Sequence, residues 1–249
     1  MRVSTLVLRN ESSHARSDVP FSQQTVVCMA KVISLKNEND WSVERESGST
    51  KERLLQVAKE LFAQKGFHGA STREITQRAG VSLSSLHFHW QSKENLYLAV
   101  YRQLFQSLTA LAQEVVEVLE EGLRSGQPLE EVIEPVTDRI FAFYDANREL
   151  AQLNLHKALE NSSLAGQIEK EIEHPLYQTM ARFYRRLTEK GLVKVTDPEL
   201  LPFSLENLLD RYFADPEHVE RSLGLEREVL RVRLRNHFLE TFLRLLQGA

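Results

Sequence analysis

The stretch from Ser71 to Trp90 constrains the fold of this chain most strongly, because its pattern predicts two short helices joined by a tight turn. Ser71 and Glu74 have the spacing of a capping box, which predicts that a helix begins there. Gly80 can adopt the left-handed conformation that ends a helix, and Ser82 can cap the next one. Two short helices around a glycine turn are typical of a helix-turn-helix, whose second helix enters the major groove of DNA.

Helical patterns also flank this stretch. Ser49 and Glu52 form a second capping box before an apolar helical pattern that ends at Gly66, and Ser92 can cap a long helix. Residues 49–98 resemble the DNA-binding domain of the TetR/AcrR family of transcriptional regulators, through the segments TKERLLQVAKELFAQKGF, STREITQRAGVS and LHFHWQSKENL. The resemblance implies an all-α fold, in which an N-terminal three-helix helix-turn-helix domain precedes a larger helical domain for ligand binding and dimerisation.

Four residues of this unit depart from the family pattern without changing its architecture. Thr76 stands where the family usually has alanine, Ser84 where it often has glycine, and Trp90 where phenylalanine is usual. His87 replaces a tyrosine that, in the family, commonly contacts a DNA phosphate. A neutral imidazole can donate only one hydrogen bond, so this replacement predicts a weaker or pH-sensitive phosphate contact.

Charge is distributed unevenly along the sequence. The formal net charge of −4 alone argues against a nucleic-acid binder. Residues 49–98, however, carry seven Lys and Arg against four Asp and Glu, whereas residues 99–249 carry 18 against 25. Because phosphate repels the acidic part, this distribution favours docking of DNA on the helix-turn-helix alone.

The second helix of the unit offers mostly small polar side chains for contact with DNA. No Lys or Arg lies between Gly80 and Gln91, so base readout there does not rest on an arginine–guanine pair. For Leu83 two alternatives stay open, because it either folds back onto the first helices or touches a thymine methyl group. We expect Ser71, Thr72 and Lys93 to contact DNA phosphates. The other expected DNA contacts are Ser82, Leu83, Ser84, Ser85, His87 and Phe88.

Residues 99–249 show helical periodicity and no strand pattern. We expect this segment to form the effector-binding and dimerisation domain, after the DNA-binding domain at 49–98. The predicted helices cover residues 92–121, 129–143, 148–160, a long segment that ends by 190, 198–214 and 226–246. We expect the first helix to stop at Gly122, the second to have a kink at Pro135 and the long one to have a kink near Pro175.

Residues 1–48 carry a weaker signal. Val3–Leu8 and Thr25–Leu35 are short apolar alternations consistent with strands, but Glu38–Ser49 is polar and rich in turn formers. We therefore expect a disordered or loosely packed extension. A start of translation at Met29 is an alternative, in which the preceding residues would not belong to the protein.

The last predicted helix has apolar residues on more than one face. One row has i, i+4 spacing, and Val232, Leu239 and Leu243 lie on other sides of the helix. A helix of this kind must be covered on more than one face, which is consistent with the family's dimer, in which the last two helices of each subunit form a four-helix bundle. The alternative is a central helix of a monomer. The residues predicted to form the dimer interface are Leu230, Leu234, Phe238, Phe242 and Leu246.

The resemblance also implies a small-molecule pocket inside the helical domain. Each candidate residue has plain core packing as its alternative role. Because apolar and aromatic side chains dominate, we expect a hydrophobic or amphipathic effector. The predicted pocket residues are Leu104, Leu108, Phe141, Tyr144, Leu155, His156, Tyr177, Met180 and Tyr184.

Other classes of function find little support in the sequence. No common catalytic or nucleotide-binding motif is present, so we expect no enzyme activity and no cofactor. His87, His89 and His68 do not form a convincing zinc site, because side chains two apart on a helix point to different sides. The single cysteine, Cys28, and the absence of a long apolar run or a signal pattern are consistent with a cytoplasmic protein.

Two hypotheses follow from these observations. The leading one is a ligand-responsive repressor that binds a short palindrome in double-stranded DNA as a homodimer. The rival keeps DNA as an anchor, but its acidic helical domain binds a protein partner instead of a small molecule. No group of residues in the sequence supports a third hypothesis, an all-helical enzyme.

Overall fold

The computed structural model describes residues 49–160 and 162–248, and every regular element in these ranges is helical. The predicted all-α fold class is therefore confirmed for this part of the chain. The expected extension, with its two strand-like segments, Cys28 and Met29, lies outside the described residues. Among the described helices, none combines the length and the apolar character needed to cross a membrane.

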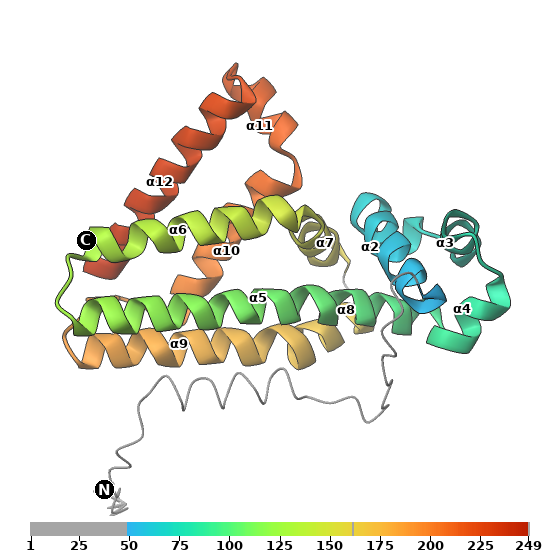
Figure 1. Cartoon of the computed structure of the whole chain (residues 1–249), viewed down its shortest axis with the longest axis horizontal. Coiled ribbons are helices and arrows are strands. Elements are labelled where there is room, and N and C mark those ends of the chain that lie inside the picture. The colour runs from blue at the N-terminus through green and yellow to red at the C-terminus, as the bar shows by residue number, and fades with distance from the viewer. Residues whose placement is uncertain (1–48, 161, 249) are drawn as a thin grey trace, which may run out of the picture.

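Three short helices at one end of the molecule form the helix-turn-helix unit (Figure 1): α2 (Thr50–Gly69), α3 (Thr72–Ala79) and α4 (Leu83–Trp90). The predicted capping box is present, because the Glu52 N–H donates to Ser49 Oγ at 3.2 Å and the Ser49 N–H donates to Glu52 Oε2 at 3.3 Å. Leu61, Ile75 and Leu86, one from each helix, are fully buried. This shared core fixes α3 and α4 at a set angle on α2.

The rest of the described chain is a larger helical body. In Figure 1, α5 runs beside α9 and beneath α6, while α11 and α12 rise above α6. Helix α7 packs against α2 on one side and α10 on the other. The elements are α5 (Lys93–Arg124), α6 (Leu129–Ala146), α7 (Arg148–Leu159), α8 (Ser163–Ile168), the π-helical turn η1 (Glu169–Glu173), α9 (His174–Glu189), α10 (Leu200–Ala214), α11 (Pro216–Leu223) and α12 (Arg227–Gln247).

One predicted helix boundary is wrong, and one helix was not predicted. Gly122 does not stop α5, which continues to Arg124; a Cβ at Gly122 would lie 2.6 Å from Val132 Cγ2, so glycine here permits close approach of α5 and α6. A short helix between residues 214 and 226 was not predicted. It is α11, capped by Asp215, whose Oδ1 accepts from the His218 N–H at 3.0 Å.

The apolar row of α12 is not the dimer interface that we expected. Leu230, Phe238, Phe242 and Leu246 are at most 3% exposed within a single chain, and Leu234 is half-buried. The Phe238 ring packs edge to face on Phe141, with 5.7 Å between the ring centroids. Periodicity correctly indicated burial, but the covering partner is α6 of the same chain, not a second subunit.

Candidate DNA-binding interface and effector cavity

A sharp turn holds α4 away from the helical body. Gln91 has φ 61° and ψ −47°, and the Ser92 N–H donates to the Trp90 carbonyl at 2.6 Å, which together define a γ-turn. A side chain at positive φ is strained here, because this conformation favours glycine. Ser92 then caps α5 by accepting from the Asn95 N–H at 3.1 Å. The turn from α4 into α5 is thus fixed on both sides.

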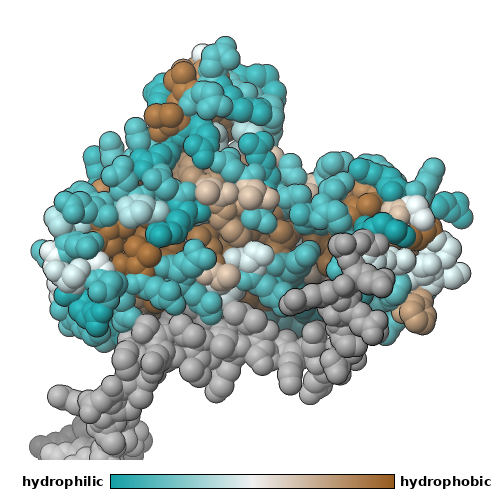
Figure 2. Space-filling view, viewed as in Figure 1, coloured by the Kyte–Doolittle hydropathy of each residue, from teal (hydrophilic) through white to brown (hydrophobic). Residues whose placement is uncertain are grey.

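The outer face of α4 is accessible to solvent. Phe88 is 78% exposed and Leu83 is 44% exposed, so Leu83 does not fold back onto the first helices in this structure. Ser82, Ser84 and His87 are also exposed, whereas Ser85 is half-buried. In Figure 2, pale, weakly polar residues cover the end of the molecule where Figure 1 places α4. This surface can contact base edges without bringing a charge into the groove.

The serine hydroxyls of α4 have different roles. Ser82 Oγ accepts from the Ser85 N–H at 3.1 Å and lies 2.9 Å from Ser85 Oγ, so these two hydroxyls stabilise the start of the helix. Ser84, between them in sequence, points to solvent on the exposed face. Of the three predicted serine contacts, Ser84 therefore has the hydroxyl best placed for DNA.

The geometry of His87 gives the expected pH-sensitive phosphate contact a specific chemical basis. His87 Nδ1 lies 2.9 Å from the Gln91 carbonyl oxygen, which can only accept, so Nδ1 carries the proton and donates. In the neutral ring, Nε2 is then an acceptor and cannot bind a phosphate oxygen. Only the imidazolium form offers an Nε2–H to the DNA backbone.

Several basic side chains of the unit are already paired. Lys65 Nζ lies 2.6 Å from Glu74 Oε1, and an Arg78 Nη2 lies 3.3 Å from Glu60 Oε2. Lys93 Nζ lies 4.3 Å from the centre of the Phe67 ring, and partial burial lowers the pKa of its ammonium group. The predicted phosphate contact of Lys93 would thus require the side chain to leave this ring.

The start of α3 is the other part of the predicted interface. Ser71 is exposed, and its Oγ accepts from the Glu74 N–H at 3.1 Å; Thr72 is half-buried. Arg73, which follows, is exposed, although it was not among the predicted contacts. A phosphate can bind at a helix N-terminus beside an exposed arginine, because the backbone N–H groups of the first turn and the positive charge lie close together.

Comparison with known proteins agrees with this geometry. Residues 54–100, which span most of α2 through the start of α5, match the family described as "Bacterial regulatory proteins, tetR family". The helix-turn-helix unit is therefore a TetR-family DNA-binding domain. The chain is similar to DNA-binding regulators of transcription, as the resemblance in its sequence predicted.

Two relatives show how far the likeness to TetR-family regulators extends. The chain is 25% identical over 179 residues to the HTH-type transcriptional regulator YdgC of Bacillus subtilis, a match covering 64% of this chain and 90% of that protein. It is 42% identical over 60 residues to the HTH-type transcriptional regulator RutR of Escherichia coli, which covers 24% of this chain and 28% of that protein. Identity is thus higher over a short segment than over the longer match.

A solved structure extends the likeness of fold beyond that unit. A TetR-family transcriptional regulator from Mesorhizobium loti superposes with a TM-score of 0.53 and 22% sequence identity, covering 80% of this chain and 98% of that one. Both parts of the predicted arrangement, an N-terminal helix-turn-helix and a larger helical C-terminal part, are therefore confirmed as a fold.

The structure groups some of the predicted pocket residues and separates others. An apolar cavity of about 110 Å³ lies among α5, α6, α9, α10 and α12. Its lining includes five predicted residues: Leu108, Tyr144, Tyr177, Met180 and Tyr184. A more polar cavity of about 470 Å³ lies beside it and includes Leu155 and, again, Tyr177.

Three predicted pocket residues line neither cavity. Leu104 and Phe141 are at most 3% exposed and belong to the packed core. His156 instead faces the DNA-binding unit, where its Nδ1 would lie 3.0 Å from a Cβ added at Gly66. Helical periodicity identifies buried positions but not which of them border a cavity.

The polar cavity contains residues that sequence reasoning missed. Asn154, Glu206 and Asp210 line it, and the last two lie four apart on α10, each directly after a buried leucine. That spacing within an apolar helix was the available signal, since buried carboxylates need a reason. The described residues contain no group of three His, Cys, Asp or Glu suited to hold a metal ion.

Proposed function

We propose that this protein is a cytoplasmic, ligand-responsive repressor that binds a short DNA palindrome as a homodimer. The observation that carries the proposal is α4, whose exposed face of small polar and apolar side chains is held outward by a γ-turn. The proposed DNA-contacting residues are the predicted ones, with Ser84 and Phe88 at the centre and Arg73 added. The division near residue 98 between a DNA-binding and an effector-binding domain is part of the same proposal.

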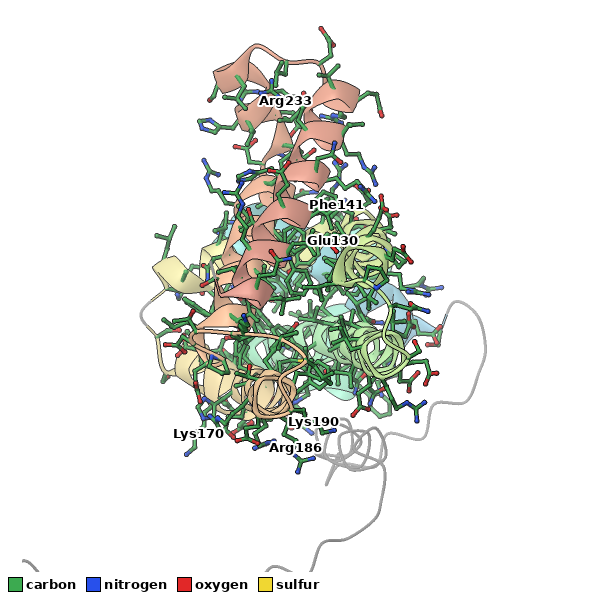
Figure 3. All side chains as sticks on the ribbon, turned by 90° about the vertical axis from the view of Figure 1, so that its left-hand side faces the viewer. Glu130, Phe141, Lys170, Arg186, Lys190 and Arg233 are labelled. Carbon is green, nitrogen blue, oxygen red and sulfur yellow. The ribbon has the colours of Figure 1, made fainter. Side chains whose placement is uncertain are left out.

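The proposed dimer uses the opposite face of α12 from the one first expected. Val229, Val232, Asn236, Leu239 and Leu243 recur at alternating spacings of three and four, which is the pattern of a coiled-coil seam. Val229 and Val232 are 49% and 56% exposed, and Leu239 and Leu243 are partly exposed. Figure 3 shows α12 along one face of the molecule, with Arg233 near its outer end. An apolar stripe left open on a single chain favours a second chain as its cover.

Two helices connect the effector region to the DNA-binding unit. Helix α5 begins at the DNA-binding unit and later lines the apolar cavity through Leu108 and Ala112. Helix α7 is a second link, since the Phe67 N–H donates to Glu160 Oε1 at 3.1 Å and Lys59 Nζ lies 3.3 Å from Glu149 Oε1. A ligand that prefers a shifted position of these helices would move α4 away from the groove spacing.

Filling the apolar cavity should mimic the effector. We expect Ala112→Trp and Leu108→Trp to weaken DNA binding about tenfold or more, because the indole would force α5 to move and so bias the position of α4. The measurement is DNA affinity by fluorescence anisotropy alongside the melting temperature of each variant. The matched control is Gln106→Trp, at an exposed position of the same helix. Folded cavity variants with unchanged affinity would show that α5 does not couple the two sites.

The affinity for DNA should fall steeply with salt. Each phosphate neutralised by the protein contributes a slope of about −0.9 to a plot of log affinity against log salt concentration. We expect Arg73→Gln to reduce the magnitude of the slope by about 1 for each subunit, because that arginine is exposed at the start of α3. Arg139→Gln, at an exposed position of α6, is the control and should leave the slope unchanged. A flat plot for the parent protein would contradict the proposed docking.

A further inference from the structure

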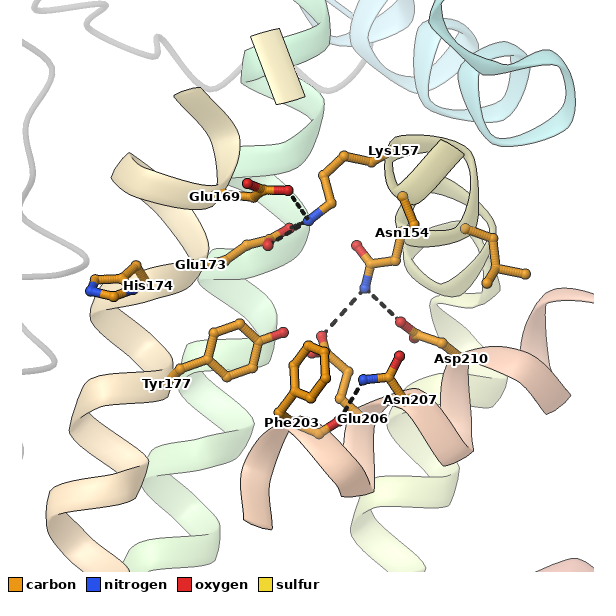
Figure 4. A pocket seen from close by; sticks show the side chains of 12 residues that line it. Asn154, Lys157, Glu169, Glu173, His174, Tyr177, Phe203, Glu206, Asn207 and Asp210 are labelled. Atoms are coloured by element: carbon orange, nitrogen blue, oxygen red, sulfur yellow. Dashed lines mark hydrogen bonds and ion pairs between the residues drawn. The ribbon is translucent and has the colours of Figure 1, made fainter. Parts of the chain in front are cut away.

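The polar cavity beside the apolar one contains an unusual concentration of carboxylates. Figure 4 shows side chains from α7, η1, α9 and α10 converging on it. Glu169 and Glu173 come from η1, Glu206 and Asp210 come from α10, and Lys157 of α7 is the only lysine or arginine in the lining. With the four carboxylates ionised, four negative charges would share this space with the one positive charge of Lys157; His174 of α9 also lines it.

The lysine in the cavity is already engaged. Lys157 Nζ lies 2.5 Å from both carboxylate oxygens of Glu173 and 3.9 Å from Glu169 Oε1. Both partners of the close pair are largely buried, with side-chain exposures of 11% and 7%. Such a bidentate, charge-assisted contact leaves little of the lysine's charge for the two carboxylates on α10.

Donors for the α10 carboxylates are too few. Asn154 Nδ2 donates to Asp210 Oδ2 at 2.9 Å and to Glu206 Oε1 at 3.3 Å, which uses both of its hydrogens. Asp210 Oδ1 and Asn154 Oδ1 are buried and accept no hydrogen bond from the described residues. Asp210 itself is only 6% exposed. Two acceptor atoms in this cavity thus accept no hydrogen bond, although the Tyr144 hydroxyl is near enough to Asp210 to lower its pKa.

This arrangement of buried carboxylates destabilises the folded protein. Desolvation by burial raises the pKa of Asp210 to about 7, with the Glu173 carboxylate adding to the shift and Asn154, Lys157 and Tyr144 opposing it. Burial also raises the pKa of Glu206, and the Asp210 carboxylate beside it has the same effect. A buried acceptor without a donor destabilises a fold, and apolar residues at these two positions of α10 would avoid that cost.

We propose that this cavity binds an organic cation, an amine or a guanidine on an apolar body, whose N–H groups donate to Asp210, Glu206 and Asn154 Oδ1. The inference rests on the proposed function and names the chemical class of its effector. The aromatic rings of Tyr177 and Phe203, whose centroids lie 6.3 Å apart, flank the cavity and can contact a cation or an apolar body. Tyr177 and Glu206 also line the apolar cavity, so the two cavities adjoin and the body of the ligand would extend toward the apolar one.

Helix α7 would report occupancy to the DNA-binding unit. Asn154 and Lys157 face the cavity, and Glu160, one turn beyond, accepts from the Phe67 N–H. A cation that takes over the carboxylates now bonded to Asn154 would release that side chain from α10. The resulting change in how α7 packs on α10 would reach α2 through the Glu160 contact.

The test uses the full-length protein and a matched panel of small molecules. Isothermal titration at pH 8 would compare 2-phenylethylamine, agmatine and spermidine with 2-phenylethanol and phenylacetate, which share the body of the first but are neutral or anionic. We expect saturable binding of at least one cation and none of the neutral or anionic compounds. Absence of binding by every cation, or equal binding of the neutral and anionic compounds, would overturn the inference.

Variants locate the binding within the protein. Asp210→Asn keeps the shape of the side chain and should weaken cation binding roughly tenfold, since it removes one charge-assisted hydrogen bond. Glu114→Gln, an exposed position on α5, is the control and should bind as the parent does. Lowering the pH from 8 to 6 should also weaken binding in the parent, because burial raises the pKa of both neighbouring carboxyls, Asp210 and Glu206, and they take up protons together; the effect should be smaller in Asp210→Asn. Equal affinity of the parent and Asp210→Asn would place the cation elsewhere and contradict the proposal.

DNA binding measured on the same samples separates this inference from the proposed function. If no cation binds while salt-dependent DNA binding is intact, the ligand class is wrong and the regulator stands. If a cation binds in the polar cavity but the protein binds no DNA, the assignment of the ligand class to that cavity stands and the proposed function fails.

Discussion

Val232→Glu is expected to separate the proposed dimer into folded subunits, whereas Phe238→Glu is expected to prevent folding. Val232 is 56% exposed on the outward stripe of α12, so a charge there is solvated in the monomer and loses its hydration only when a second chain covers it. Phe238 is fully buried between Phe141 and Phe242. An unpaired charge at that position costs about 3–5 kcal/mol, a large part of the roughly 5–15 kcal/mol that stabilises a typical domain.

Sedimentation velocity and circular dichroism distinguish these two outcomes. Val232→Glu should sediment as a monomer with parental helix content and should lose DNA affinity, because one subunit contacts only half of a palindrome. Glu240→Gln, at an exposed position of the same helix outside the stripe, is the control. A parental dimer after Val232→Glu would place the subunit interface on another surface, and a well-folded Phe238→Glu would contradict the packing of α12.

Ser84→Glu should abolish specific DNA binding, with a loss of affinity of about 100-fold or more. The exposed face of α4 carries no carboxylate, and a glutamate there would bring a negative charge between two rows of phosphates. Ser84 makes no contact that stabilises α4, unlike Ser82 and Ser85, so the melting temperature should change by no more than a few degrees.

The control for Ser84→Glu is Gln106→Glu, which adds the same charge at an exposed position of α5, away from α4. It should lower affinity only slightly, through the long-range repulsion that salt screens. Equal losses in the two variants would mean that net charge governs binding rather than the position of α4. A folded Ser84→Glu protein with parental affinity would remove α4 from the interface.

The local structure of the DNA-binding unit was predictable because its signals act over four residues or fewer. The caps at Ser49, Ser71, Ser82 and Ser92 and the left-handed Gly80 all have the predicted geometry. Each depends on backbone N–H groups of the first helical turn, which only nearby side chains can satisfy. The γ-turn at Gln91 was not predictable, since glutamine rarely adopts positive φ.

Longer-range features were harder to predict, because a sequence indicates burial without naming the partner. The row from Leu230 to Leu246 was correctly expected to be covered, yet α6 of the same chain, not a second subunit, lies against it. In the same way, Phe141 and His156 have the spacing of cavity residues but face the core and the DNA-binding unit. The spacing of Glu206 and Asp210 within an apolar helix was visible in the sequence, but only the packing of α7 on α10 shows that they share a cavity.

Selection of binding sites from random double-stranded DNA would show most clearly whether α4 makes this chain a sequence-specific regulator. The parent protein and Ser84→Glu would be carried through the same rounds at the same salt concentration. We expect the parent to enrich one palindrome whose half-sites lie about one helical turn, roughly 34 Å, apart, and Ser84→Glu to enrich none. The same enriched sequence from both proteins, or no enrichment by the folded parent, would contradict this role of α4.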